Sequence, residues 1–255
     1  MKILAVGDLV GESGVEKLKR VLPSLRQKEA IDFVIVNGEN SANGFGITRK
    51  IFDDLQRLKV DVITMGNHTW GKKDIFDFID NDKIIRPANY SKNLPGKGYG
   101  IYECKGKKIA VINLIGRVEM GILSENPYFV VEDIINRIRE KVDFIIVDFH
   151  AEATAEKVAM GYFLDGRVDA IFGTHTHVQT ADEKIMEKGT AYITDIGMTG
   201  PKDSIIGMDK DVALKRFLYS IPERYKLASG ECCFNGCIFE TNVDDCKIVK
   251  IYRIN

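Results

Sequence analysis

The chain contains only four histidines, and each of them follows a short apolar run. They are His68, His150, His175 and His177. Because runs of this length and β-branched content are typical of buried strands, the four rings are predicted to lie at the carboxyl ends of strands. Ligands bind at that edge in open α/β sheets. His175 and His177 are two residues apart, so in an extended segment both rings would point the same way. The pattern indicates a ligand-binding or catalytic sheet edge.

Carboxylate and amide side chains stand at the ends of the same apolar runs. Asp8 ends the first run, Glu39 and Asn40 follow the second, and Asn67 directly precedes His68. A glycine comes immediately before Asp8, Glu39 and Asn67, where it permits the tight turn that aims a polar side chain over a sheet edge. Imidazole and carboxylate ligands suit zinc, manganese or iron, and the lack of a neighbouring cysteine argues against a thiolate site.

Each of these residues, taken alone, also has a structural explanation. Asp8 could cap a helix that begins near Ser13, and Glu39 and Asn40 could be polar residues of a turn. A single histidine after a strand is often a hydrogen-bonded core or rim residue. The complete set favours a metal site, because every histidine of the chain lies at such a position and acids or amides occupy the matching strand ends.

The elements that must position these side chains alternate along the chain. Apolar runs that predict strands cover residues 3–6, 33–36, 60–65, 109–114, 144–147 and 168–172. Helical spacing of apolar residues appears between them, over 15–25, 51–58 and 131–138. This alternation predicts an α/β fold with a largely parallel sheet whose faces are covered by helices.

The C-terminal part of the chain departs from this alternation. Residues 191–196, 232–243 and 247–254 have the character of strands with less helix between them, and the turn Val243-Asp-Asp-Cys246 suits a hairpin. This change favours a second, more antiparallel sheet packed on the first. No repeat, low-complexity tract or linker interrupts the sequence, so residues 1–255 are predicted to form a single domain.

The charge balance and the distribution of apolar residues limit which partners and which cellular compartment the protein is expected to have. The chain has 36 basic and 37 acidic residues, a net charge of -1, which argues against an extended nucleic-acid surface but not against a small substrate or the end of an oligonucleotide. Asp8 interrupts the first apolar stretch before a signal core could form, and no run is long enough to span a bilayer. A cytoplasmic protein is therefore expected, and a homo-oligomer remains open.

The five cysteines predict no covalent framework. An odd number fits reduced thiols better than a complete set of disulfides. Four of them, Cys232, Cys233, Cys237 and Cys246, could form a zinc site, but the spacing is not C-x-x-C and no histidine lies nearby. Cysteines buried in strands are the favoured interpretation.

In chain order, the polar residues resemble the motifs of the calcineurin-like metallophosphoesterases. The counterparts are Asp8, Gly38-Glu39-Asn40, Gly66-Asn67-His68, His150 and His175-Thr176-His177. Two positions depart from that pattern: Val10 replaces the histidine of an Asp-x-His motif, and Glu39 replaces an aspartate that usually bridges two metals. Both changes, with Asn40 available as a replacement ligand, are similar to the YmdB-like subfamily of bacterial cyclic-nucleotide phosphodiesterases.

The resemblance implies a fold and an activity. The fold is a four-layer α-β-β-α sandwich of two mixed sheets flanked by helices. The activity is hydrolysis of 2′,3′-cyclic, and also 3′,5′-cyclic, nucleotides to nucleoside monophosphates. The implied cofactor is a pair of divalent or trivalent transition-metal ions, with iron expected first and manganese or zinc as alternatives. Two such ions lower the pKa of a bridging water, which then attacks as hydroxide, and polarise the phosphate.

The resemblance also implies roles for the individual residues. Asp8, Asn40 and His177 are expected to bind one metal, Asn67, His150 and His175 the other, and Glu39 both. His68 is expected to protonate the leaving alkoxide; orienting the adjacent Asn67 is its alternative role. Asn43, Phe45 and Arg86 could line the substrate cavity, and Trp70 could stack on a base or simply be buried.

Other functions remain as alternatives. Gly66-Asn-His-Thr-Trp-Gly71-Lys72-Lys73 approaches a phosphate-binding P-loop, but Lys73 replaces the Ser or Thr that would ligate magnesium. A phosphomonoesterase or a nuclease could use the same fold. The same ligands could also hold a metal in a non-catalytic regulatory protein, because sequence alone does not show an open coordination position.

Overall fold

The computed structural model describes residues 1–220, 222–242 and 244–255. The strands are β1 (Lys2–Val6), β2 (Asp8–Leu9), β3 (Phe33–Asn37), β4 (Val62–Thr64), β5 (Ile84–Ile85), β6 (Tyr99–Cys104), β7 (Lys107–Ile115), β8 (Phe144–His150), β9 (Ala170–Thr174), β10 (Lys184–Ile185), β11 (Ala191–Ile193), β12 (Met198–Pro201), β13 (Cys232–Cys233), β14 (Gly236–Asn242) and β15 (Lys247–Ile254). The helices are α1 (Gly11–Glu29), α2 (Arg49–Arg57), α3 (Pro127–Ile138), α4 (Thr154–Leu164) and α5 (Lys210–Tyr219), with 3-10 turns at Lys73–Asp77 and Arg139–Lys141.

The described residues form two six-stranded mixed sheets and a small three-stranded sheet of order β13-β12-β2. The first has the order β15-β14-β1-β3-β4-β5, in which β1, β3, β4 and β5 run parallel and β14 pairs antiparallel with β1. The second has the order β10-β11-β9-β8-β7-β6, with β11, β9, β8 and β7 parallel and an antiparallel strand at each edge. The carboxyl ends of the parallel strands are thus available in both sheets.

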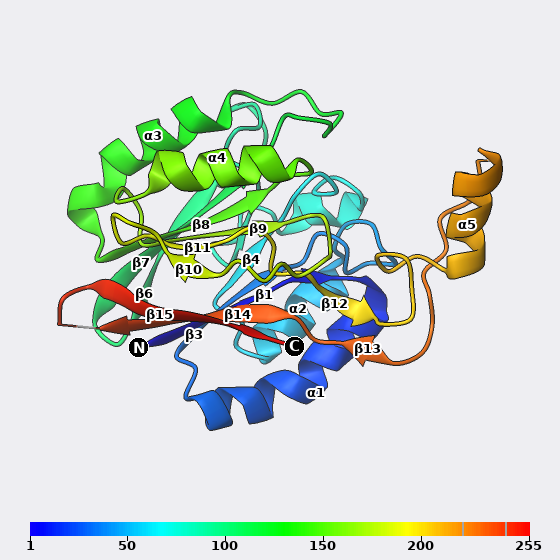
Figure 1. The fold of residues 1–255 in the computed structure, drawn as a ribbon, viewed down its shortest axis with the longest axis horizontal. Helices are drawn as coiled ribbons and strands as arrows, with labels where there is room; N and C mark the ends of the chain where they lie inside the picture. The colour runs from blue at the N-terminus through cyan, green and yellow to red at the C-terminus, as the bar shows by residue number, and fades with distance from the viewer. Residues whose placement is uncertain (221, 243) are drawn as a thin grey trace.

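Four layers stack in the order helix, sheet, sheet, helix (Figure 1). Helices α3 and α4 cover the outer face of the second sheet, and α1 and α2 cover the outer face of the first. Between the sheets lies a dry layer that includes Ile3, Phe33, Ile146 and Phe172. Successive side chains of each strand point to opposite faces of the sheet, so alternate residues lie in different apolar layers. This is the predicted α-β-β-α sandwich.

The helices begin where local chemistry allows them to begin. The side chain of Thr48 accepts a hydrogen bond from Ile51 N to cap α2, and Asn126 caps α3 ahead of Pro127. Helix α1 has Val10 at its N-cap, with no side-chain cap. Asp8, the alternative cap considered from the sequence, lies in β2 and is left for another role. Among the described residues, no helix combines the length and apolarity needed to cross a membrane.

The expected placement of the C-terminal strands is wrong. Strands β14 and β15 pair antiparallel with each other, but they extend the first sheet beside β1 and do not build the second one. Strand character in a sequence does not specify the pairing partner, and the edge of β1 was open on that side. The expected hairpin turn began at Val243, which lies outside the described residues.

Candidate active site

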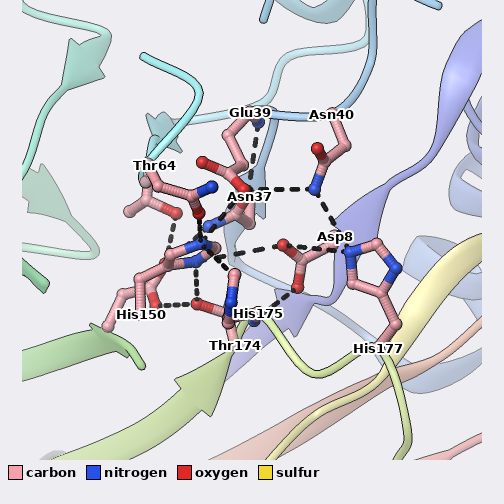
Figure 2. Close-up of polar contacts among 12 residues, drawn as sticks. Asp8, Asn37, Glu39, Asn40, Thr64, His150, Thr174, His175 and His177 are labelled. Carbon is pink, nitrogen blue, oxygen red and sulfur yellow. Dashed lines mark hydrogen bonds and ion pairs between the residues drawn. The ribbon is translucent and has the colours of Figure 1, made fainter. Parts of the chain in front are cut away.

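All eight residues singled out from the sequence meet at the seam between the two sheets. Asp8, Glu39, Asn40, Asn67 and His68 follow the parallel strands of the first sheet, while His150, His175 and His177 end or follow those of the second. In Figure 2 the Asp8 carboxylate lies between the ring of His177 and the rings of His150 and His175. The site exists only because the two sheets face each other with their carboxyl edges aligned.

The centre of the cluster is the Nε2 atom of His150, whose side chain is fully buried. Three electron-pair donors converge on it: Asn67 Oδ1 at 2.8 Å, Glu39 Oε1 at 3.0 Å and His175 Nδ1 at 3.1 Å. On the other side of the ring, Thr174 Oγ1 lies 2.8 Å from Nδ1. Because that hydroxyl donates its own proton to Asp148 Oδ1 at 2.7 Å, it accepts the Nδ1–H of His150. The Nε2 lone pair therefore faces the cluster.

The other two rings of the second sheet are oriented in the same way. His177 donates Nδ1–H to the backbone oxygen of Ile206 at 2.8 Å. His175 places Nε2 at 3.0 Å from Glu152 Oε2, which accepts that proton. Each imidazole thus gives its proton to an acceptor outside the cluster and presents its other nitrogen inward. Outer acceptors fix the tautomer of metal-binding histidines in this manner.

Asp8 carries an unsatisfied oxygen. Its Oδ2 accepts from the backbone N–H of His175 at 3.2 Å, whereas Oδ1 is buried with no hydrogen-bond partner among the described residues. Burial raises the pKa of the Asp8 carboxyl above its usual range. Burying an unpaired carboxylate oxygen is costly. A cation beside Oδ1, which faces His177 Nε2 at 3.8 Å, would remove that cost.

The electrostatics of the cluster indicate a missing positive charge. Burial alone would raise the pKa of Glu39, but the nearby His150 and His68 together hold that pKa at about 2. Burial opposes protonation of His150, yet Glu39 and Asp8 raise its pKa to about 9. Burial and the charge on His150 lower the pKa of His175 to about 3. One proton is therefore held among several bases, and a metal cation would take the place of that proton.

The donor set fits a transition metal. One ligand atom each from Glu39, His150 and His175 lies within 4.8 Å of the others, so this group could hold a metal ion. Gly66 keeps the space open, because a Cβ there would lie 2.4 Å from both Glu39 Oε2 and His150 Nε2. Nitrogen and carboxylate ligands without a thiolate suit iron, manganese or zinc. In the part of the chain that the structure describes, the cysteines form no comparable group.

The two polar atoms of the Asn40 amide contact three neighbouring side chains. Its Oδ1 lies 2.7 Å from Nδ1 of His68, and its Nδ2 lies 3.2 Å from both Glu39 Oε1 and His177 Nε2. Ligation of a metal beside Glu39 and His177 needs the amide oxygen on that side, so the amide would have to turn over. Burial lowers the pKa of His68, against the opposing effect of Glu39.

A cavity of about 510 Å³ opens beside the cluster. Site residues and residues from other loops line it together: Glu39, Asn40, His68, Glu152, His175 and His177, with Asn43, Phe45, Lys72, Ile206, Met208 and Tyr225. The volume lies in the range of small-molecule sites. Asn43 and Phe45 were expected here from the sequence.

Two other residues considered for the cavity do not line it. The Arg86 guanidinium is buried and donates to backbone carbonyls within residues 87–95 at 2.8 to 3.0 Å, which makes it a loop brace. It borders a separate cavity of about 490 Å³ that contains none of the histidines. Trp70 stacks on Phe76, with ring centroids 5.4 Å apart, and contacts Tyr90. Trp70 is half-buried against the core and does not line the cavity, so the structure favours packing over base stacking for this residue.

Comparison with known proteins places the chain in a family. The family described as "YmdB-like protein" matches residues 4–254. The chain belongs to the YmdB-like family. A 2′,3′-cyclic-nucleotide 2′-phosphodiesterase from Bacillus subtilis (strain 168) is 48% identical over 255 residues, which cover 100% of this chain and 96% of that protein. This relationship identifies the chain as an enzyme of the phosphodiesterase and phosphatase class.

Solved structures agree with the family and the fold. A novel phosphatase from Mycoplasma pneumoniae has a TM-score of 0.94 and 37% identity, covering 100% of this YmdB-like chain and 92% of that one. A 5′-nucleotidase precursor from Thermus thermophilus has a TM-score of 0.61 and 11% identity, covering 99% and 53% of the two chains. The second likeness concerns the fold alone, and it confirms the predicted metallophosphoesterase-type sandwich.

Val10, which departs from the Asp-x-His motif considered from the sequence, is fully buried in this YmdB-like chain. Two glycines make room for it. A Cβ on Gly200 would lie 2.8 Å from Val10 Cβ, and one on Gly207 would lie 2.6 Å from Val10 Cγ1. The side chain is a packing element between two backbone segments.

Sequence reasoning missed a buried ion pair behind the histidine loop. Lys157 Nζ lies 2.6 Å from Asp195 Oδ2, and the same oxygen accepts from the Thr176 hydroxyl at 2.6 Å and from its N–H at 3.3 Å. Thr176 stands between His175 and His177, whose φ angles of 95° and 64° are strained for non-glycine residues. The pair therefore pins the strained loop. Asp195, an acid inside the apolar run 191–196, was the residue in the sequence that could have indicated this buried pair.

A second missed residue is Asp148, which lies inside strand β8 and is fully buried. It accepts hydrogen bonds from the hydroxyls of Thr64 and Thr174 and, at 3.3 Å, from Asn37 Nδ2. Burial raises the pKa of Asp148 to about 6. Through Thr174 it sets the orientation of His150. A charged residue two positions before a histidine in an apolar strand could have indicated this role.

The Gly66→Ala substitution tests the metal centre. The variant should fold, because Gly66 is not among the positive-φ residues, but its methyl group would occupy the space between Glu39 and His150. We expect its metal content, measured by elemental analysis, to fall to near zero relative to the wild type. Gly161→Ala is the matched control: its Cβ would lie 2.6 Å from the Tyr192 ring, so stability should fall while metal remains. A fully loaded Gly66→Ala protein would contradict the site.

The Lys157→Met substitution tests the buried ion pair. It leaves Asp195 charged and unpaired in the interior, so the free energy of unfolding should fall by about 3–5 kcal/mol, measured by urea denaturation. Lys210→Met is the control, because Lys210 pairs with Asp203 at 2.6 Å on the surface, where an ion pair contributes little. Equal effects of the two substitutions would show that the Lys157–Asp195 pair does not hold this loop.

Proposed function

We propose that this YmdB-like protein is a dinuclear-metal phosphodiesterase that hydrolyses 2′,3′-cyclic nucleotides to 3′-monophosphates, with 3′,5′-cyclic nucleotides as a further substrate class. The observation that carries the proposal is the convergence of Asn67, Glu39 and His175 on Nε2 of His150, with the unsatisfied Asp8 Oδ1 nearby. That arrangement lies open to a cavity large enough for a nucleotide. The 48% identical Bacillus subtilis relative is named for this activity.

The proposed ligand sets follow the two halves of the cluster. Asp8, Asn40 and His177 would hold one ion, Asn67, His150 and His175 the other, and Glu39 would contact both. The short distances from Asn67, Glu39 and His175 to His150 support the second set. The 3.8 Å approach of Asp8 Oδ1 to His177 Nε2 supports the first. Iron is the proposed metal, with manganese and zinc as alternatives that the same donors accommodate.

When bound, the ions would supply a nucleophile at neutral pH, by lowering the pKa of water, and would offset negative charge on the phosphoryl oxygens. The protein orients the reaction around them. Asp148 and Thr174 hold His150, Glu152 holds His175, and Ile206 holds His177 through its carbonyl. Rings fixed in this way lose little freedom when they ligate, which preorganises the site.

His68 is the proposed proton donor. Its ring lines the cavity, and its Nδ1 lies 2.7 Å from the Asn40 amide. Once that amide has turned over to ligate a metal, Asn40 Nδ2 would donate to Nδ1, which leaves the proton of His68 on Nε2. In the proposed step, a water releases one proton to solvent, its oxygen forms a bond to phosphorus, and the bond between phosphorus and the 2′ oxygen breaks. The 2′ oxygen takes a proton from His68, which solvent then protonates again. The alternative function is hydrolysis of phosphomonoesters, which the name of the Mycoplasma pneumoniae phosphatase suggests.

The products of 2′,3′-cyclic AMP separate these functions. Cleavage at the 2′ bond should yield adenosine 3′-monophosphate, identified by chromatography against both monophosphate standards. A matched incubation with adenosine 3′-monophosphate should release little phosphate. Release of phosphate from the monoester with no action on the cyclic diester would reject the diesterase and favour the phosphatase. Turnover of neither substrate by metal-loaded protein would favour a regulatory role.

The His68→Ala substitution tests the proton donor. With a ribose leaving group, which departs poorly without a proton, kcat should fall by about 10²-fold or more. With bis(4-nitrophenyl) phosphate, whose leaving group needs no proton, the loss should be much smaller. Metal content should stay at the wild-type value. Glu39→Ala is the contrasting variant, expected to lose metal and to fail on both substrates. Equal losses on both substrates in His68→Ala would argue against the role.

A further inference from the structure

The cavity has an apolar side that the metal cluster does not use. Phe45, from the loop after β3, and Ile206, Met208 and Tyr225, from the segment between β12 and β13, face into it. Three of these side chains are large and unusually exposed, at 50% for Phe45, 50% for Ile206 and 46% for Tyr225. Exposed apolar groups gathered inside a cavity are typical of a ligand-binding surface.

The two aromatic rings are held by glycines that let the backbone come close. A Cβ on Gly71 would lie 2.6 Å from the Phe45 ring, and one on Gly44, whose φ is 77°, would lie 2.7 Å from the Tyr225 ring. The Phe45 ring also contacts the ring of His68, with centroids 4.4 Å apart. The exposed parts of both rings are thus positioned before any ligand arrives.

The apolar side is tied directly to the metal cluster. Ile206 lines the cavity with its side chain and accepts the His177 Nδ1–H with its carbonyl oxygen at 2.8 Å. Its neighbour Met208 is anchored through the next residue, since Asp209 N donates to Lys226 O at 2.9 Å, directly after Tyr225. The distance between the aromatic side and the cluster is therefore set by backbone hydrogen bonds.

We infer that this apolar side, formed by Phe45, Ile206, Met208 and Tyr225, is the seat of the nucleobase of the substrate. The inference rests on the proposed function, because it takes the phosphate to lie at the metal cluster. A base attached through ribose then extends along the cavity toward the aromatic rings. Stacking on aromatic rings accepts every base, since all four have a π face. The seat should therefore bind purines and pyrimidines alike and favour substrates that carry a base.

Its test compares two substrates that share the reacting diester. Wild-type enzyme should have a kcat/KM on 2′,3′-cyclic AMP that exceeds its kcat/KM on ribose 2,3-cyclic phosphate, which lacks a base. In Tyr225→Ala and Phe45→Leu this preference should fall by about tenfold, whereas Tyr225→Phe should retain it. Tyr219→Ala, an exposed aromatic on α5 that does not line the cavity, is the matched control and should retain it as well. An unchanged preference in Tyr225→Ala and Phe45→Leu would overturn the seat, even with full diesterase activity.

A binding experiment separates failure of the seat from failure of the proposed function. Calorimetric titration of metal-loaded protein with adenosine 3′-monophosphate and with inorganic phosphate needs no turnover. The nucleotide should bind more tightly than phosphate, and Tyr225→Ala should remove about tenfold of that difference. If the wild type cleaves no cyclic diester but this binding difference is found and is lost in the variant, only the proposed reaction fails. Equal affinity of wild type for the two ligands would reject the seat itself.

Discussion

The buried negative charge at the seam between the two sheets governs the arrangement of the site. Asp8, Glu39 and Asp148 are all fully buried, although isolated carboxylates are almost never tolerated in an interior. Asp148 is satisfied by hydroxyl and amide donors, and Glu39 by backbone and imidazole groups. Asp8 keeps one oxygen without a partner among the described residues. The cluster is electrostatically incomplete as a set of protein groups alone, which is the physical reason to regard it as a cation site.

The other features of the site can be understood as consequences of the need to satisfy this buried negative charge. The histidines pass their protons outward to Thr174, Glu152 and the carbonyl of Ile206, so that lone pairs face inward. The loop that carries two of them adopts strained backbone angles and is held down by a buried Lys157–Asp195 pair. Strain and buried charge both reduce stability on their own. A fold that carries both of these destabilising features in one loop is less stable than it could be, but it holds the histidines in a fixed geometry.

Much of this arrangement could be predicted because it is encoded locally. Apolar runs predict strands, and polar residues at the carboxyl ends of parallel strands gather at a sheet edge, so the α/β fold and the grouping of the eight polar residues at strand ends were predictable. That two sheets bring these ends together was implied only by the family resemblance. The pairing of the C-terminal strands was not predictable, because the edge of β1 could pair with any strand of suitable length, and in the structure β14 pairs with it. Lys157 and Asp148 contact partners that lie far from them in the sequence. The helix and strand patterns of a sequence do not predict which residues will contact each other at such separations. Ile206, Met208 and Tyr225, which line the cavity, lie outside the helices and strands, so no periodic pattern marks them in the sequence.

The packing of Val10 bears on how this ligand set could have arisen. Its side chain fills a space bounded by Gly200 and Gly207 so closely that neither glycine could carry a methyl group. A histidine at this position would be overpacked against the same backbone, at a cost that conservative repacking does not relieve. A single substitution at residue 10 therefore would not convert the proposed ligand set into one with Asp-x-His. The segments that carry Gly200 and Gly207 would have to be remodelled first or together with residue 10, so the effects of these changes would depend on one another.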